Sequence, residues 1–163
     1  MPRETLDRET HHLLDEVLIL GSMVEQATLD AVDALTDRDR PAAKRIFIND
    51  RQINEKRFAI ENATLVLLAT QQPMAHDLRV MAAILEIITE LERIGDYAKG
   101  IALVCVRLGD NPVNMPARDF TRMAELAVDM LHRSLNAFVR EDAVLARAIP
   151  KDDDTVDEIY NKV

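Results

Sequence analysis

Two carboxylates one helical turn apart, Glu92 and Asp96, are the side chains of this sequence best placed to do chemistry. They lie in residues 72–105, where apolar side chains recur at the spacing of a helix. With successive residues 100° apart, both acids continue the line of Leu78, Leu85 and Thr89 and fall in the middle of the predicted apolar arc. A buried carboxylate is costly unless it is protonated, paired with a cation or bound to a metal. We therefore expect Glu92 and Asp96 to be buried and to have a neutralising partner.

A second polar pair, Asp50 and Asn54, interrupts the apolar face of the preceding helical stretch. Carboxylate and amide oxygens from facing helices suit Mg, Mn, Ca or iron, so the two pairs together form a candidate metal site. The alternative is a buried polar layer in which Arg57 or Arg93 neutralises the acids. Both hypotheses place these side chains at a helix–helix contact.

The elements that must position these residues are helices. Four glycines, no tryptophan and long apolar runs at helical spacing predict an all-α protein. The expected helices cover residues 5–36, 41–70, 72–105, 117–139 and from 142 to the end, with Pro150 as a kink. Residues 72–105 are apolar over more than half of the circumference, so this helix should be central, with one solvent stripe of Arg79, Glu86, Glu90, Arg93 and Tyr97. Gly21 should permit close packing in the first helix.

An internal repeat appears when the sequence is shifted by 103 residues. Apolar positions match, and Asp39, Asp50 and Asn54 meet acidic residues. We expect a first three-helix bundle over 1–110, a linker over 111–116 and a partial second repeat of two helices over 117–163. The third helix of that repeat would lie beyond Val163, so we expect the sequence to be part of a longer chain. The candidate metal ligands are Asp50, Asn54, Glu92, Asp96 and, as half of a second site or as a solvated acidic run, Asp153 and Asp157.

Charge and cysteine usage exclude several classes of function. With 20 basic and 29 acidic residues the net charge is −9, which repels nucleic acid and anionic membrane surfaces. The lone Cys105 cannot form an intramolecular disulfide, which favours a reducing compartment. No signal-peptide or membrane-spanning run is visible, so we expect a cytoplasmic protein.

Four further patterns are the run Q-P-x-x-x-D-L-R over 72–79, the acidic motif E-R-I-G-D over 92–96, G-S-M-V-E over 21–25, and the Asp50-x-x-x-Asn54 pair. Together these motifs resemble those of the PhoU family of phosphate-signalling regulators. The resemblance implies a tandem repeat of three-helix bundles with no catalytic activity. It further implies a negative regulator of the phosphate-starvation response and of phosphate uptake. Such a regulator couples the ATPase subunit of a phosphate ABC transporter to a sensor histidine kinase.

The same resemblance implies a homodimer that reaches the membrane through its partners. It also implies a multinuclear iron or zinc cluster on the acidic motifs, with Mg or Mn as further options and a metal-free state as another. The second acidic motif would lie beyond Val163.

Two alternatives stay open. One is a helical adaptor that binds partners without any metal. The other is a ferritin-like di-iron protein, suggested by Glu9 with His12 and by Asp129 with His132. Elemental analysis of protein purified without chelator separates a metal-binding regulator from a metal-free adaptor.

Overall fold

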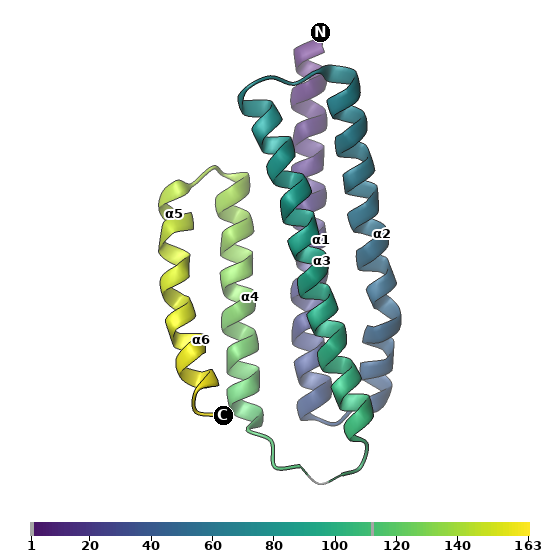
Figure 1. The fold of residues 1–163 in the computed structure, drawn as a ribbon, viewed down its shortest axis with the longest axis vertical. Coiled ribbons are helices and arrows are strands. Elements are labelled where there is room, and N and C mark those ends of the chain that lie inside the picture. The colour runs from purple at the N-terminus through teal and green to yellow at the C-terminus, as the bar shows by residue number, and fades with distance from the viewer. Residues whose placement is uncertain (1, 112) are drawn as a thin grey trace.

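The computed structural model describes residues 2–111 and 113–163, with Pro2 and Arg3 described for their backbone alone. Met1 and Pro112, the latter inside the predicted linker, lie outside the described residues. The helices are α1 (Pro2–Thr36), α2 (Arg40–Gln71), α3 (His76–Leu108), α4 (Ala117–Val139), α5 (Ala143–Ala148) and α6 (Asp153–Tyr160), with a 3-10 turn, η1 (Ile149–Asp152), between the last two (Figure 1). No strand occurs in the described ranges, and the all-α prediction is confirmed.

Helices α1, α2 and α3 form a three-helix bundle in which α2 runs antiparallel to α1 and α3, and the core lies along their shared axis (Figure 1). Apolar side chains at intervals of three and four residues meet there, because that spacing places them on one helix face. Fully buried core residues include Val17, Leu20, Val24, Ile60, Met81, Ile84, Ile88 and Leu91. Each such side chain contributes about 1.5 to 3 kcal/mol through burial. Among the described polar and charged residues only Asp50 and Thr64 are buried, and the Thr64 hydroxyl donates to Ile60 O at 2.8 Å.

The central helix begins later than predicted, at His76 rather than residue 72. Pro73 disfavours helical geometry in Gln72, which adopts a left-handed φ of 47°. Ala75 also has a positive φ, 49°. The chain therefore reverses between α2 and α3 before the new helix starts.

The second unit, which consists of α4, α5, η1 and α6, packs along the length of the first, the α1–α3 bundle. Helix α4 packs along α1, and α5, η1 and α6 pack on α4 (Figure 1). Gly21 in α1 is buried at this contact, and a Cβ built on it would lie 2.2 Å from Leu135 Cδ1 of α4. The glycine thus permits the close approach that the sequence predicted. Pro150 lies in the 3-10 turn, so the last predicted helix is divided in two there.

Polar contacts from several directions also join the two units. His132 Nδ1 lies 3.3 Å from Glu25 Oε1, and His76 Nε2 lies 2.9 Å from Glu141 Oε1. The Arg38 guanidinium donates to the backbone carbonyls of Asn111 and Val113, and Arg40 pairs with Asp110 at 3.0 Å. These arginines hold the segment between α3 and α4 against the turn between α1 and α2.

The internal repeat is reproduced in backbone hydrogen bonds. Asp39 N donates to Ala34 O at 2.9 Å, and Asp142 N donates to Ala137 O at 2.8 Å. Asp39 caps α2 by accepting from Ala42 N, and Asp142 caps α5 by accepting from Val144 N and Leu145 N. These two backbone bonds and the capping aspartates of the first turn therefore have their counterparts 103 residues later.

A small apolar cluster near the turn between α1 and α2 contains the lone cysteine. Cys105 is buried beside Ala34, Ala43 and Ala102, and its thiol donates to Ala34 O at 3.1 Å. Burial raises the pKa of the Cys105 thiol, and the nearby Asp39 carboxylate raises it further. The side chain is therefore a protonated thiol that acts as a small apolar residue.

Candidate functional site

The polar cluster that the sequence singled out lies between α2 and α3, and Asp50 is at its centre. Asp50 is 6% exposed, and its Oδ2 accepts from Lys99 Nζ at 2.7 Å and from Asn54 Nδ2 at 3.2 Å. Lys99 Nζ also lies 3.6 Å from Asp96 Oδ1 and 5.4 Å from the centroid of the Phe47 ring. The cluster therefore consists of two carboxylates, one amide and one ammonium, under one aromatic ring.

The structure brings Asp50, Asn54 and Asp96 together but corrects the predicted burial of the α3 acids. The Asp96 side chain is 52% exposed, and Glu92 is half-buried. Glu92 makes no hydrogen bond or ion pair to another described residue. Leu78, on the same helical line, is also exposed. This line lies at the edge of the buried arc, whose centre follows residues such as Ile84 and Ile88.

The arginines proposed as neutralising partners were the wrong residues. Arg57 pairs with Glu61 at 3.1 Å on its own helix, and Arg93 pairs with Glu90 at 2.9 Å on the solvent stripe. The cation at Asp50 is instead Lys99, which the sequence analysis missed. The sequence does contain a signal, because Lys99 lies one turn after Asp96 and is the only lysine between residues 72 and 105.

The electrostatics of the cluster follow from these contacts. The hydrogen bond from Lys99 to Asp50 raises the pKa of the Lys99 ammonium, and the charges of Asp50 and Asp96 add to this effect against the opposing effect of burial. Asp50 Oδ1 is a buried oxygen without a hydrogen-bond partner. The charge of Asp50 is therefore neutralised, while one of its oxygens is left unsatisfied.

The donor set does not form a ready metal site. Within the described ranges, no three His, Cys, Asp or Glu side chains converge as metal ligands would. Asn54 turns its amide nitrogen toward Asp50, since that nitrogen also donates to the Asp50 backbone oxygen at 3.1 Å, and a carbonyl can only accept. Lys99 Nζ lies between the two aspartates, where a metal ion would have to sit.

The residues that suggested other sites lie apart from this cluster. Asp153 and Asp157 are exposed on α6, where neither is in an ion pair with a described residue. The pairs that suggested a di-iron protein point to separate partners: Glu9 pairs with Arg8, Asp129 with Arg133 and His132 with Glu25. These pairs do not come together as one ligand set.

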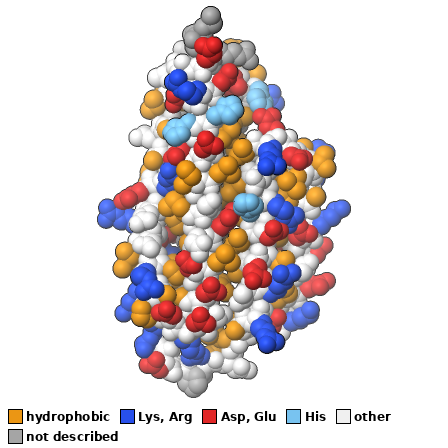
Figure 2. All heavy atoms as spheres, turned by 180° about the vertical axis from the view of Figure 1, so that it is seen from behind, with side chains coloured by type: hydrophobic (Ala, Val, Ile, Leu, Met, Phe, Trp, Pro, Cys, Tyr) orange, Lys and Arg blue, Asp and Glu red, His pale blue; other side chains and the backbone are white. Residues whose placement is uncertain are grey.

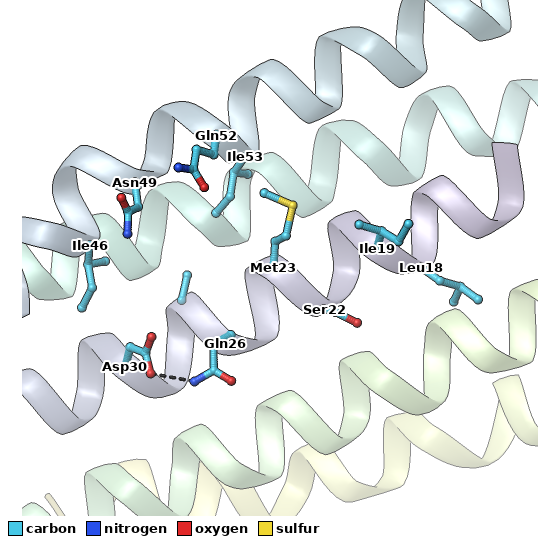
Figure 3. A pocket seen from close by; sticks show the side chains of 11 residues that line it. Leu18, Ile19, Ser22, Met23, Gln26, Asp30, Ile46, Asn49, Gln52 and Ile53 are labelled. Atoms are coloured by element: carbon cyan, nitrogen blue, oxygen red, sulfur yellow. Dashed lines mark hydrogen bonds between the residues drawn. The ribbon is translucent and has the colours of Figure 1, made fainter. Parts of the chain in front are cut away.

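A groove runs between α1 and α2 on the face seen in Figure 2, where apolar side chains lie between charged ones. Its volume is about 550 Å³, and Figure 3 shows Met23, Ile46 and Ile53 along it, with the Gln26 amide donating to Asp30 at 2.7 Å. Toward the turn between the helices, the lining becomes acidic through Asp30, Asp33, Asp37 and Asp39. The groove has the open shape of a contact surface rather than that of an enclosed ligand cavity.

Comparison with protein families gives a match to the PhoU domain over residues 17–104 and again over 120–163. The two matches begin 103 residues apart, in agreement with the internal repeat. The chain is 34% identical over 158 residues to a phosphate-specific transport system accessory protein PhoU homolog of Burkholderia sp, covering 95% of this chain and 67% of the relative. It is 33% identical to the phosphate-specific transport system accessory protein PhoU of Escherichia coli, covering 95% of this chain and 64% of that protein.

Solved structures of PhoU proteins are also similar to this chain. The crystal structure of the phosphate transport system regulatory protein PhoU from Streptococcus pneumoniae superposes with a TM-score of 0.88 at 32% identity, over 96% of this chain and 74% of that one. The crystal structure of PhoU from Pseudomonas aeruginosa gives 0.87 at 32% identity, over 96% and 75%. This chain spans 64% to 75% of the length of these four proteins.

The repeated turn, the three-helix bundle and the second helical unit define an all-helical protein built from a duplicated module. With the domain matched twice and relatives at this identity, the chain belongs to the PhoU family.

Proposed function

We propose that this protein is a non-catalytic accessory and regulatory protein of phosphate transport. The observation that carries the proposal is the PhoU domain match in both repeats, together with relatives whose names describe phosphate transport accessory proteins. In finer terms, it represses the phosphate-starvation response and phosphate uptake by coupling the ATPase subunit of a phosphate ABC transporter to a sensor histidine kinase. It acts as a cytoplasmic homodimer that reaches the membrane through these partners.

Surface features support a role in partner binding. Five large apolar side chains are exposed on α2 within about 100° of its circumference, as helical spacing places them. They are Phe47, Ile48, Phe58, Leu65 and Val66. Exposed apolar side chains gathered on one face are typical of protein contact sites. No described helix is long and apolar enough to cross a bilayer, so an association with a transporter would run through such contacts.

Deletion of the gene tests this proposal. In phosphate-rich medium, the deletion strain should express the phosphate transporter and take up phosphate at the rate of starved cells. Reintroduction of the gene should restore repression. Unchanged transporter expression in the deletion strain would refute the regulatory role.

A physical test addresses the partners. The tagged protein should co-purify with the transporter ATPase subunit and with the histidine kinase. The double change of Ile48 and Val66 to Ser on the outer face of α2 should weaken this without lowering the melting temperature, because both residues are exposed. Asp153→Asn on exposed α6 is a matched surface control.

A further inference from the structure

The carboxylates between α2 and α3 could attract a metal ion, but a protein cation, Lys99, already lies between Asp50 and Asp96, although Asp50 Oδ1 has no hydrogen-bond partner. Lys99 Nζ is 2.7 Å from Asp50 Oδ2, which is the distance of a charge-assisted hydrogen bond. It is 3.6 Å from Asp96 Oδ1, so one ammonium contacts both carboxylates that the cluster supplies. From these contacts we infer that Lys99 is the resident cation of the first repeat, and that a metal ion binds this cluster only if the Lys99 ammonium is displaced.

Three observations favour Lys99 as the resident cation over a metal site that the Lys99 side chain covers only when no metal is bound. The amide of Asn54 faces Asp50 with its nitrogen, which cannot ligate a cation. The Lys99 ammonium lies within 4 Å of both Asp50 and Asp96, so it occupies the position between the two carboxylates that a metal ion would need. The Phe47 ring lies over the ammonium at 5.4 Å, where its electron-rich face stabilises an organic cation.

The position of Lys99 also explains how a metal could compete. The Lys99 side chain is 32% exposed, and its flexible stem lets the ammonium move into solvent without unfolding the helix. Asp50 has no such freedom, because its side chain is 7% exposed. Loss of the ammonium therefore leaves a buried carboxylate with no counter-charge, which either destabilises the bundle or recruits another cation.

Three purified proteins test the inference: the wild type, Lys99→Met and Lys56→Met. Methionine keeps the apolar stem and removes the charge. Lys56 is a matched control, since it also lies on the bundle surface, is 23% exposed and pairs with a carboxylate, that of Glu16. Melting temperatures are measured in EDTA and in excess Mn²⁺ or Zn²⁺, and metal content is measured after purification without chelator.

The wild type should contain no stoichiometric metal, and its melting temperature should not respond to EDTA or to either ion. Lys99→Met should melt about 6 to 20 °C lower in EDTA and recover part of this loss with metal. Lys56→Met should lose stability without any metal-dependent recovery. Stoichiometric metal in the wild type would overturn the inference, as would a Lys99→Met protein that is fully stable in EDTA or no more metal-responsive than Lys56→Met.

A further variant covers the case in which Lys99→Met does not fold. Lys99→Arg keeps the positive charge and should retain the wild-type melting temperature and its insensitivity to metal. Metal-dependent stability in Lys99→Arg or in the wild type would contradict a resident protein cation. Because these readouts are metal content and stability, they are independent of whether the protein regulates phosphate transport.

Discussion

Arg38 and Glu141 adopt the same left-handed backbone conformation, with φ of 56° and 54°, at positions 103 residues apart. Neither residue is a glycine, so each turn holds a side chain in a conformation that costs about 1 kcal/mol or more. In both turns the next residue is an aspartate that caps a helix. The duplication of the module therefore extends to a strained turn and its cap, beyond the matching of apolar positions.

Removing either cap should cost a similar amount. Asp39→Ala leaves one backbone N–H of the first helical turn without its acceptor and Asp142→Ala leaves two, and each change should lower the free energy of unfolding by about 1 kcal/mol. Urea denaturation measures this loss. Asp39→Asn and Asp142→Asn keep an acceptor and should be nearly neutral, so equal losses for Asn and Ala would contradict the capping role.

Two glycine substitutions should change the free energy of unfolding in opposite directions. In Gly21→Ala, the new Cβ would lie 2.2 Å from Leu135 Cδ1, so α4 must move or Leu135 must change rotamer, at about 1 to 3 kcal/mol. In Gly100→Ala, no heavy atom outside the adjacent residues and the backbone of the same helix lies within 4 Å of the new Cβ, and the higher helix propensity of alanine should stabilise α3 by up to about 1 kcal/mol. Denaturation gives the two stabilities. Limited proteolysis between α3 and α4 should increase for Gly21→Ala alone, and a stabilised Gly21→Ala would contradict close packing of α4.

The combined change Glu92→Gln and Asp96→Asn should alter stability by less than about 1 kcal/mol. Asp96 is half exposed and lies 3.6 Å from Lys99, while Glu92 has no described partner, and such surface charges contribute little. Thermal denaturation in EDTA measures the effect. The double change Glu86→Gln and Glu90→Gln on the solvent stripe is the control. A loss of about 3 to 5 kcal/mol for the first pair alone would show instead that these acids belong to a buried ion pair.

Stability should fall at alkaline pH through Cys105. Because burial raises the pKa of this thiol in the folded state, the unfolded thiol ionises first as the pH rises. Stability is therefore lost progressively above about pH 8.5, the ordinary pKa of cysteine. Cys105→Ala should remove this component, so that the difference in unfolding free energy between the two proteins shrinks from pH 8 to about pH 10. Parallel pH profiles for the two proteins would contradict an effect of Cys105.

Local sequence was sufficient for the helices and for the repeat. The start and end of α4 coincide with the predicted 117–139, since a run of two prolines and a glycine precedes it and a capped turn follows it. The 3-10 turn at Pro150 follows from a residue that has no N–H to donate. The late start of α3 could also be predicted from the sequence, because Pro73 disfavours a helix in the residue before it.

The site was harder to predict because its partners come from different helices. The apolar arc of α3 is wide, and periodicity alone does not say which part of it faces a neighbour. The structure buries the line through Ile84, Ile88 and Gly95 and leaves Asp96 toward solvent. The contact between Lys99 and Asp50 joins residues 49 positions apart, so it depends on the register of α2 against α3. No local pattern encodes that register.

The arginine contacts between the α1–α2 turn and the α3–α4 segment have a consequence for chain entropy. By holding Asp110, Asn111 and Val113, Arg40 and Arg38 shorten the free tether between the bundle and α4. A shorter tether raises the effective concentration of α4 at α1, so redocking after a local opening becomes a fast intramolecular event. A second unit that opened locally would therefore return to the same position along α1.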